Sequence, residues 1–326
     1  MLRQIRGIHH FTYGVGGAQE DYDFHARTLG LRFLKKTALY EGDVPIYHLY
    51  YGNAYGDPGT VLTSLPMRQQ GIRGRLGANQ IARLNLSIPV EAIGFWTDRL
   101  RAAGIDVELV ELCGTQRLHF RHPCGIPYGM VADGDGDPAR SFEGNGISTD
   151  DAILGNHGIT INVAEPDAMV EYLENGLGAA RAGSDGRTLR WRVGETGCSG
   201  YVELVETPDE PPGTQRLAEG SVHHCAWDVV DKRRQSDLKG SLEQLGYASW
   251  TGPLDRTYFV SVYNRTPSGA LFEYCWSKPA SWAIDEPDDQ LGQAFHIPPM
   301  FADREQEFIE YLEPIETGIS VNASTT

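Results

Sequence analysis

The stretch VHHCAWDV, from Val222 to Val229, reads as a β-strand that opens with two adjacent histidines. Side chains alternate between the two faces of a strand, so His223 and His224 are expected to point in opposite directions. Taken alone, the pair is typical of one outward polar residue beside one hydrogen-bonded core histidine. The stretch decides the fold because it has counterparts elsewhere in the chain.

Four strand-like segments of this kind recur, and each ends in Val or Ile. They are IHHFTYGV (8–15), ARLNLSI (82–88), HGITINV (157–163) and VHHCAWDV (222–229). Each is followed by a helical stretch and then by a glycine, 15 to 17 residues after the strand end. A glycine just past a helix is the expected left-handed C-cap. Further strand-like runs follow each helix, so every unit reads β-α-β-β-β.

A single unit of this type leaves a half-curled sheet with an unburied face, and two units side by side bury that face and form a cup. The sequence therefore predicts an α+β fold with four βαβββ modules in two cup-shaped half-barrels. Tandem regions are expected at about 6–133 and 152–278. The modules are expected at residues 1–76, 77–137, 150–212 and 213–278, followed by a C-terminal tail at 279–326.

The composition of the chain argues against two classes of binding partner, nucleic acids and membranes. The 326 residues carry a formal net charge of −16 and no lysine- or arginine-rich block, which argues against nucleic acid. No apolar run approaches the roughly 20 residues that span a bilayer, so no membrane partner is expected. Five cysteines without a C-x-x-C spacing indicate neither a disulfide framework nor a zinc–thiolate site. We expect a cytoplasmic protein that acts on a small molecule.

The four copies differ at positions that carry chemistry. In the first and fourth copies a His-His pair places its second histidine, His10 or His224, five residues before the closing valine. Near the end of the fourth copy, Glu273 stands four residues after a glycine, where the first and second copies have Thr63 and Gly129. The sequence thus predicts that the carboxylate appears only in the fourth copy.

Two histidines and one carboxylate form the facial triad of non-haem Fe(II) sites, which leaves coordination positions open for substrate and O₂. His10, His224 and Glu273 are therefore the predicted ligands of Fe(II), and Mn(II) suits the same set. A glutamate inside the apolar run ALFEYCW needs a partner, because an unpaired buried carboxylate is costly. His10 and His224 can meet only if the first and fourth modules share a cup.

At these residues the chain resembles the vicinal oxygen chelate superfamily, and most of all its hydroquinone ring-cleaving dioxygenases. The likeness covers almost the whole chain. It is strongest in GIHHFTYGVGGAQEDYDF (7–24), EGSVHHCAW (219–227) and YFVSVYNRTPSGALFEY (258–274). The resemblance implies that the second histidine of each pair and the glutamate bind Fe(II). It also implies catalytic roles for His9, His223, Arg256 and Tyr263, and substrate binding by Thr12, Arg256 and Tyr263.

This resemblance conflicts with strand alternation, which turns His9 and His223 away from the ligand face. A β-bulge at each pair, or twist at the rim of the cup, would reconcile the two arguments. Arg256 and Tyr263 stand just before the glutamate strand in DRTYFVSVY. A guanidinium and a phenol at that place could hydrogen-bond a phenolate or an oxygen intermediate.

Other titratable residues are assigned to the core. His48 alternates with tyrosines in IYHLYY and is expected to pack within a sheet, with a pocket-lining position as the alternative. Glu203 has no histidine pair in its own unit. His157 lacks a second histidine, which indicates that the third copy has lost site function.

The expected activity is Fe(II)-dependent opening of a hydroquinone-type ring, a para-diphenol with or without halogens or other substituents, by O₂. Three alternatives stay open: an extradiol catechol dioxygenase with the same triad, a glyoxalase-type isomerase or lyase, and a non-catalytic small-molecule binding protein. Glyoxalase-type chemistry usually uses more carboxylate ligands, and a pure binder needs no open metal site. A homo-oligomer is compatible with the sequence.

Overall fold

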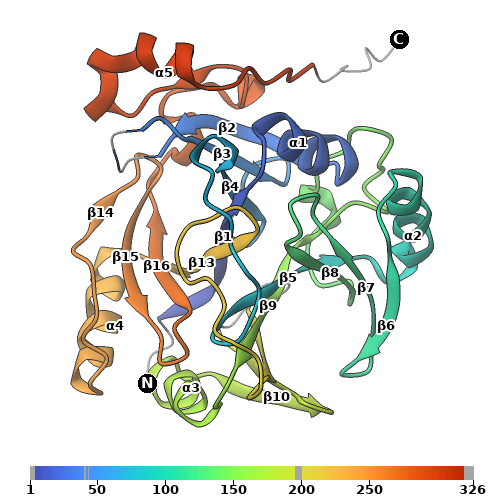
Figure 1. Cartoon of the computed structure of the whole chain (residues 1–326), viewed down its shortest axis with the longest axis vertical. Coiled ribbons are helices and arrows are strands. Elements are labelled where there is room, and N and C mark those ends of the chain that lie inside the picture. The colour runs from blue at the N-terminus through green and yellow to red at the C-terminus, as the bar shows by residue number, and fades with distance from the viewer. Residues whose placement is uncertain (1–3, 40–41, 43, 195–199, 319–326) are drawn as a thin grey trace.

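Two mixed β-sheets form the body of the computed structural model (Figure 1). The structure describes residues 4–39, 42, 44–194 and 200–318. The first strands of the first and fourth modules, β1 (Ile5–Val15) and β13 (Ser221–Val229), pair antiparallel at the centre of one sheet. Those of the second and third modules, β5 (Gln80–Ile88) and β9 (Gly155–Val163), pair antiparallel in the other. The modules therefore pair first with fourth and second with third.

The remaining strands lie outward from these central pairs. In spatial order, the nine-stranded sheet is β14 (Leu254–Asp255), β15 (Phe259–Arg265), β16 (Leu271–Ser277), β13, β1, β4 (Val61–Pro66), β3 (Tyr47–Gly52), β2 (Arg32–Ala38) and β17 (Phe295–His296). The eight-stranded sheet is β10 (Ala180–Asp185), β11 (Thr188–Arg192), β12 (Tyr201–Glu206), β9, β5, β8 (Pro127–Ala132), β7 (Thr115–Arg121) and β6 (Glu108–Leu112).

A helix follows the first strand of every module, as the repeat predicts. These helices are α1 (Ala18–Tyr22), which continues as a π-helical turn at Asp23–Thr28, α2 (Ile93–Ala102), α3 (Asp167–Glu171), which continues as a π-helical turn at Tyr172–Gly176, and α4 (Lys232–Gln244). The glycine after each helix has a φ between 66° and 94°, a left-handed conformation that favours glycine. Short 3₁₀ turns lie at Arg68–Gln70, Val90–Ala92, Pro138–Arg140, Ser281–Ile284, Asp288–Gln290 and Pro299–Arg304.

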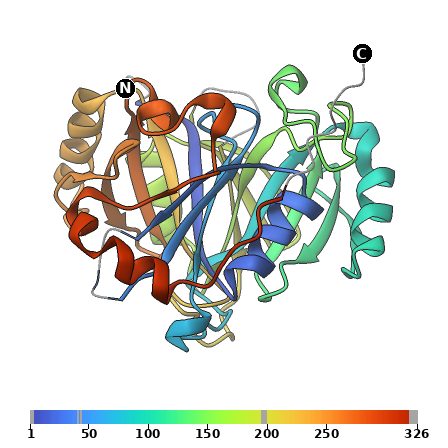
Figure 2. The ribbon, with the colours of Figure 1, turned by 90° about the horizontal axis from the view of Figure 1, so that it is seen from above.

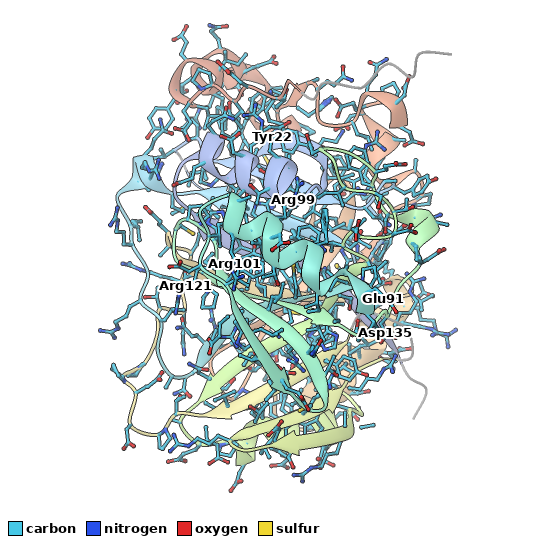
Figure 3. All side chains as sticks on the ribbon, turned by 90° about the vertical axis from the view of Figure 1, so that its right-hand side faces the viewer. Tyr22, Glu91, Arg99, Arg101, Arg121 and Asp135 are labelled. Carbon is cyan, nitrogen blue, oxygen red and sulfur yellow. The ribbon has the colours of Figure 1, made fainter. Side chains whose placement is uncertain are left out.

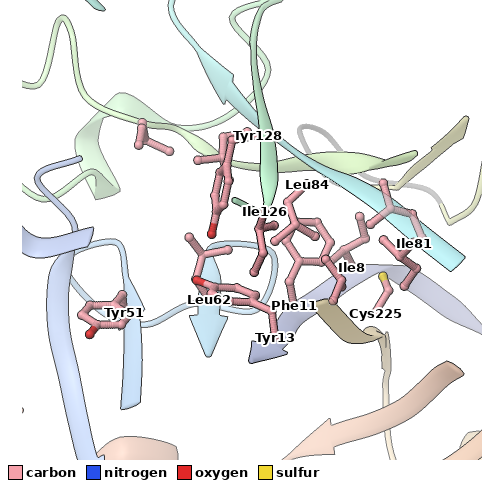
Figure 4. Packing of buried hydrophobic residues seen from close by; sticks show 14 of the residues in the cluster. Ile8, Phe11, Tyr13, Tyr51, Leu62, Ile81, Leu84, Ile126, Tyr128 and Cys225 are labelled. Atoms are coloured by element: carbon pink, nitrogen blue, oxygen red, sulfur yellow. The ribbon is translucent and has the colours of Figure 1, made fainter. Parts of the chain in front are cut away.

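One apolar core fills the space between the two sheets. Phe11 and Tyr13 of β1 are buried there with Leu84 of β5 and Tyr128 of β8 (Figure 4). Each side chain of this size that is removed from water contributes roughly 1.5–3 kcal/mol to stability. Because side chains alternate along β1, burial of Phe11 and Tyr13 on this face directs the neighbouring even-numbered residues to the opposite face.

The helices of the first and second modules are also tied together directly. Arg99 of α2 donates from Nε to the carbonyl oxygen of Thr28, at 2.7 Å, and from Nη2 to that of Arg27, at 2.8 Å. Figure 3 shows Arg99 beneath the helix that carries Tyr22. Because Thr28 ends the π-helical turn after α1, these bonds give partners to carbonyls at a helix end.

The described part of the tail crosses the nine-stranded sheet (Figure 2). It adds β17 beside β2 and ends with α5 (Glu305–Tyr311). Trp282 packs its ring against Tyr50 of the first module and Tyr258 of the fourth, so the tail joins the two modules. Buried Lys35 pairs with Asp285 at 2.7 Å. Within the described residues, no helix combines the length and apolar character that crossing a bilayer demands.

Candidate metal centre

A cavity of about 370 Å³ opens between the strands of the first and fourth modules. Six of its lining residues are large and apolar: Leu39, Leu65, Leu217, Leu254, Phe259 and Leu271. The others are polar or charged: His10, Thr12, His48, His223, His224, Thr251, Arg256, Tyr263, Arg265 and Glu273. A cavity of this size, in which large apolar side chains surround converging polar groups, is typical of a small-molecule site.

Three buried donor atoms converge at one side of this cavity. Nε2 of His224 lies 2.8 Å from Oε2 of Glu273 and 3.4 Å from Nε2 of His10, which is 3.5 Å from the same carboxylate oxygen. His10 comes from β1, His224 from β13 and Glu273 from β16. Three neighbouring strands of one sheet therefore bring together the three residues that the sequence predicts as ligands.

The donor set fits a divalent transition metal. With ligand bonds of about 2.0–2.2 Å, donor atoms at right angles around one ion are about 3 Å apart, and the three separations lie close to that value. Oε1 of Glu273 accepts from the hydroxyl of Ser261. Among the described residues, Oε2 of Glu273 makes no contact with hydrogen-bond geometry, although it is fully buried. Two imidazoles and one carboxylate suit Fe(II) or Mn(II).

Electrostatics favour the metal-binding state of two of the donors, Glu273 and His224. Burial alone would raise the pKa of Glu273, but the charges of His10 and His224 and their close contacts outweigh it and keep that pKa well below its ordinary value. Burial lowers the pKa of His224, and Glu273 only partly opposes this. A carboxylate and a neutral imidazole are the states that a metal ion requires of its ligands.

Each histidine pair lies at a β-bulge. Along the β1–β13 ladder Ile8 pairs with Trp227 and His10 with Ala226, which leaves His9 as the extra residue. Further along, Thr12 pairs with His224 and Tyr13 with Val222, which leaves His223 as the extra residue. The bulge that would reconcile alternation with the resemblance is therefore present at both pairs. The result differs between the two: His223 lines the cavity, whereas His9 is buried against Ser277 and Phe259.

The first histidine of each pair contacts Nδ1 of the second, the ring nitrogen that faces away from the candidate metal position. Nδ1 of His9 lies 2.9 Å from Nδ1 of His10, and Nδ1 of His223 lies 2.8 Å from Nδ1 of His224. If His10 and His224 present an Nε2 lone pair to a metal, each carries its proton on Nδ1 and donates it to its neighbour. His9 then carries its own proton on Nε2, where Ser277 Oγ lies 2.9 Å away to accept it.

Burial, and then the facing histidine, lowers the pKa of His9 and the pKa of His223 to about 3. Both rings are therefore neutral acceptors near neutral pH. A neutral acceptor behind each candidate ligand fixes its tautomer and its orientation.

Arg256 and Tyr263 lie beside the three donors. Tyr263 of β15 pairs across the ladder with Glu273, and its ring meets that of His224 edge-on with centroids 5.3 Å apart. Arg256 donates from Nη2 to the Tyr263 hydroxyl at 3.4 Å. Burial, then the charge of Glu273, raises the pKa of Tyr263 well above its ordinary value. The pair therefore offers a guanidinium and a protonated phenol to the cavity.

Thr12 and His48 complete the polar lining. Thr12 follows His10 by two residues, on the same face of β1, and its hydroxyl lies 2.7 Å from that of Thr63. His48, expected to pack within a sheet or to line a pocket, does both, because its ring packs on that of Tyr50 and also lines the cavity. Alternation along β3 fixes which residues share a face with His48, but not whether that face is packed or hollow.

The expectation of a carboxylate only in the fourth copy is wrong. Glu203 of β12 pairs with Thr160, three residues before the closing valine of its copy, and Glu273 pairs with Ala226, three residues before Val229. Glu203 is thus the counterpart of Glu273 in the third module. The glycine frame missed it because the preceding glycine stands three residues away rather than four.

Arginines surround this second carboxylate. Nη1 of Arg117 lies 2.8 Å from Oε1 of Glu203, and both side chains are buried. By strand position, Arg83 and Gly158 stand where the other sheet has His10 and His224. Arg83 lines a larger cavity of about 740 Å³ together with Arg101 and Arg121, and Figure 3 labels the latter two. A cationic side chain thus stands at one of the two histidine positions in this sheet, and a glycine stands at the other.

A further group of possible donors, Asp21, His25 and His122, lies in the core between the sheets. Oδ2 of Asp21 accepts from the Tyr51 hydroxyl at 2.8 Å, and Nε2 of His25 lies 2.8 Å from the hydroxyl of Tyr13. Asp21 also lies 3.3 Å from Nε2 of His122. These contacts describe a buried polar network that links the two sheets rather than an open site.

Two solved structures identify the class of fold. A proposed dioxygenase from Bacillus subtilis superposes with a TM-score of 0.90 at 32% identity, over 96% of this chain and 98% of that one. Glyoxalase I from Zea mays superposes with a TM-score of 0.60 at 13% identity, over 82% of this chain and 92% of that one. The chain has the vicinal oxygen chelate fold.

Curated relatives then identify the family. Chlorohydroquinone/hydroquinone 1,2-dioxygenase of Sphingobium indicum is 34% identical over 315 residues, which is 96% of this chain and 98% of the relative. MhqO of Bacillus subtilis, a proposed ring-cleaving dioxygenase, is 32% identical over 97% of this chain and 98% of its own. No family model matches the chain. The chain belongs to the ring-cleaving dioxygenases.

Proposed function

We propose that this dioxygenase uses Fe(II), held by His10, His224 and Glu273, to open the ring of a hydroquinone-type para-diphenol with O₂. The observation that carries the proposal is the convergence of these three donors at one side of a largely apolar cavity. Both atoms of O₂ enter the product, so no external reductant is needed. The printed name of the Sphingobium relative supports the choice of substrate.

When bound, Fe(II) supplies Lewis acidity toward a phenol oxygen and redox chemistry toward O₂. The protein supplies the remainder. His9 and His223 hold the ligand imidazoles in one tautomer. Arg256 and Tyr263 offer charge-assisted and neutral hydrogen bonds to a substrate oxygen that develops negative charge. The leucines and Phe259 hold the ring and exclude water.

Thr12 lies on the face of β1 that carries His10, and its register partner is His224. A hydroxyl at that position can donate to a phenol oxygen that is close to the ligands. This agrees with the substrate-binding role that the family resemblance implies. Mn(II) is the second candidate ion, because the donors suit it equally.

O₂ uptake measured on a panel of compounds tests this proposal. Protein loaded with Fe(II) under argon is exposed to O₂ with hydroquinone, with catechol, or with the hemithioacetal of methylglyoxal and glutathione. We expect O₂ uptake with hydroquinone, weak uptake with catechol, and no uptake with the hemithioacetal. Parallel samples loaded with Mn(II) decide between the two ions.

Each rival function predicts a different result. Efficient uptake with catechol alone would identify an extradiol enzyme. Isomerisation of the hemithioacetal without O₂ uptake would identify a glyoxalase-type enzyme. Tight binding of phenols without any turnover by either metal form would identify a binding protein.

A further inference from the structure

Four side chains form a continuous hydrogen-bonded row that ends in the cavity. The Tyr50 hydroxyl lies 3.0 Å from Nδ1 of His48, and Nε2 of His48 lies 3.1 Å from Oγ1 of Thr63. Oγ1 of Thr63 lies 2.7 Å from Oγ1 of Thr12. His48 and Thr12 line the cavity, whereas Tyr50 and Thr63 are fully buried. The row therefore runs from the interior to the Thr12 hydroxyl.

The chemistry of these groups couples the links of the row. A neutral imidazole has one N–H and one lone pair, and each hydroxyl has a single proton to donate. If Tyr50 donates to His48, then His48 donates to Thr63 and Thr63 to Thr12. The Thr12 proton is then directed to whatever lies in the cavity. In this state every group donates toward the cavity, and hydrogen bonds in such a chain strengthen one another.

The surroundings keep His48 neutral and immobile. Burial, and then the nearby charges of Arg256, His10 and His224, lowers the pKa of His48 well below its ordinary value. Its ring packs on that of Tyr50 at 4.3 Å, and Tyr50 packs on Trp282 of the tail at 5.2 Å. The row is thus preorganised before any substrate arrives.

Thr63 is the counterpart of Glu273 in the first module. Thr63 of β4 pairs with Thr12 of β1, and it occupies the place in the first module that Glu273 occupies in the fourth. A carboxylate at that place would face the same site as a fourth donor, and as the second anionic one. The chain has a hydroxyl there instead, and that hydroxyl is bound to Thr12 and His48 rather than left free.

We propose that Tyr50, His48 and Thr63 form a relay that turns the Thr12 hydroxyl toward a substrate oxyanion, which makes His48 and Thr63 positioning residues for phenolate binding. This inference rests on the proposed function, since it takes a phenol as the substrate. It adds to that function the buried groups that decide how the cavity recognises the oxygen of the phenol.

Thr63 provides the sharpest test, because its side chain is buried and does not line the cavity. Thr63→Val keeps the shape and removes the hydroxyl, and Thr63→Ser is the matched control that keeps the hydroxyl. Binding of hydroquinone to the Fe(II)-loaded protein is measured under argon, where no turnover occurs. We expect Thr63→Val to raise the Kd about tenfold, and Thr63→Ser to stay within about threefold of wild type.

His48 is tested in the same assay. His48→Phe removes both nitrogens, whereas the amide of His48→Gln keeps one acceptor and one donor site. We expect about a tenfold rise in Kd for His48→Phe and partial rescue for His48→Gln. Because both residues act in one row, Thr63→Val and His48→Phe together should cost about tenfold rather than about a hundredfold.

Iron content and a distant histidine serve as controls. Every variant should retain its iron, and His119→Phe, on the corresponding strand β7 of the second module, should bind hydroquinone as wild type does. Additive losses, or equal weakening by Thr63→Ser and Thr63→Val, would overturn the relay while leaving the proposed function intact. A wild-type protein that binds no phenol under argon would overturn the proposed function and the relay with it.

Discussion

Nδ1 of His224 lies 2.8 Å from Nδ1 of His223, so the two adjacent histidines meet back to back within one strand. The β-bulge at this pair makes the contact possible, because regular alternation would send the two rings to opposite faces. The same contact recurs at His9 and His10, at 2.9 Å. The first histidine of each pair is thus placed to accept the proton that a metal-binding neighbour must carry on Nδ1.

Removing this acceptor should weaken metal binding without touching a ligand. His9 is the better residue to change, because it lies outside the cavity. We expect His9→Phe to lower Fe(II) affinity by about ten- to a hundredfold, and His9→Asn, whose amide oxygen can replace Nδ1, to recover part of it. Competition with a chelator under argon measures the affinity. Wild-type affinity in His9→Phe would show that the contact does not orient His10.

Replacing the carboxylate should have a larger effect on the metal. Glu273→Gln keeps the volume and the bond from Ser261 but removes the negative charge that offsets a divalent ion. We expect the variant to fold, to hold iron poorly, and to lose O₂ uptake. Metal analysis after dialysis and the circular dichroism spectrum test this. Full iron occupancy with normal turnover would make Glu273 a structural residue.

The repeat in the sequence predicted the module order and the convergence of His10, His224 and Glu273. It could do so because the spacing from strand end to glycine reports the length of a whole βα unit. That length is nearly the same in all four modules, since each helix packs on its sheet in the same way. Ladder register is a finer property. Glu203 was set aside rather than matched to Glu273, because one residue fewer between the glycine and the glutamate shifts the glycine frame without moving the strand.

Whether a side chain faces a cavity is harder to read. His48 lies on a face that alternation identifies, but the hollow in front of it depends on how two modules curl together. Tyr50, His48 and Thr63 also come from two strands and acquire their meaning only through contacts with each other and with Trp282 of the tail.

The ion pair in the other sheet should stabilise the fold only as a pair. Arg117 and Glu203 are both buried, and Arg117 at 2.8 Å is closer to the carboxylate than Arg190 at 3.9 Å, so removing Arg117 takes away the shortest charge contact of Glu203. We expect Arg117→Met to lower the free energy of unfolding by about 3–5 kcal/mol, and Arg117→Met with Glu203→Gln to recover most of the loss. Urea unfolding of the single and double variants measures this. A double variant less stable than Arg117→Met would contradict the pairing.

The buried histidines should make the metal-free protein sensitive to mild acid. Their folded-state pKa of about 3, for His9 and His223, lies below the unfolded value of about 6.5, so the unfolded chain binds more protons between these limits. Stability is therefore fully present above pH 6.5 and falls as the pH drops, by up to about 1.4 kcal/mol per pH unit for each histidine.

Urea unfolding at pH 7 and at pH 5 tests this sign. The metal-free wild type should lose more stability between the two values than a His9→Gln, His223→Gln double variant, which has no imidazole to protonate at either position. Equal losses in the two proteins would show that these rings do not govern the acid response.

The last prediction concerns the substrate. A hydroquinone carries its two hydroxyls across the ring, so only one of them can reach the metal, whereas a catechol can chelate through both. One-point binding leaves the orientation of the ring to other groups, and Arg256 and Tyr263 stand beside the ligands with a guanidinium and a protonated phenol.

Losing one charge-assisted hydrogen bond costs about 1.5–3 kcal/mol, or roughly ten- to a hundredfold in rate when the bond acts in the transition state. We therefore expect Arg256→Ala and Tyr263→Phe to keep their iron and lose one to two orders of magnitude in kcat/KM for hydroquinone. O₂ uptake and metal analysis on the same preparations separate the two effects. Loss of iron in parallel with activity would instead assign both residues to holding the metal site together.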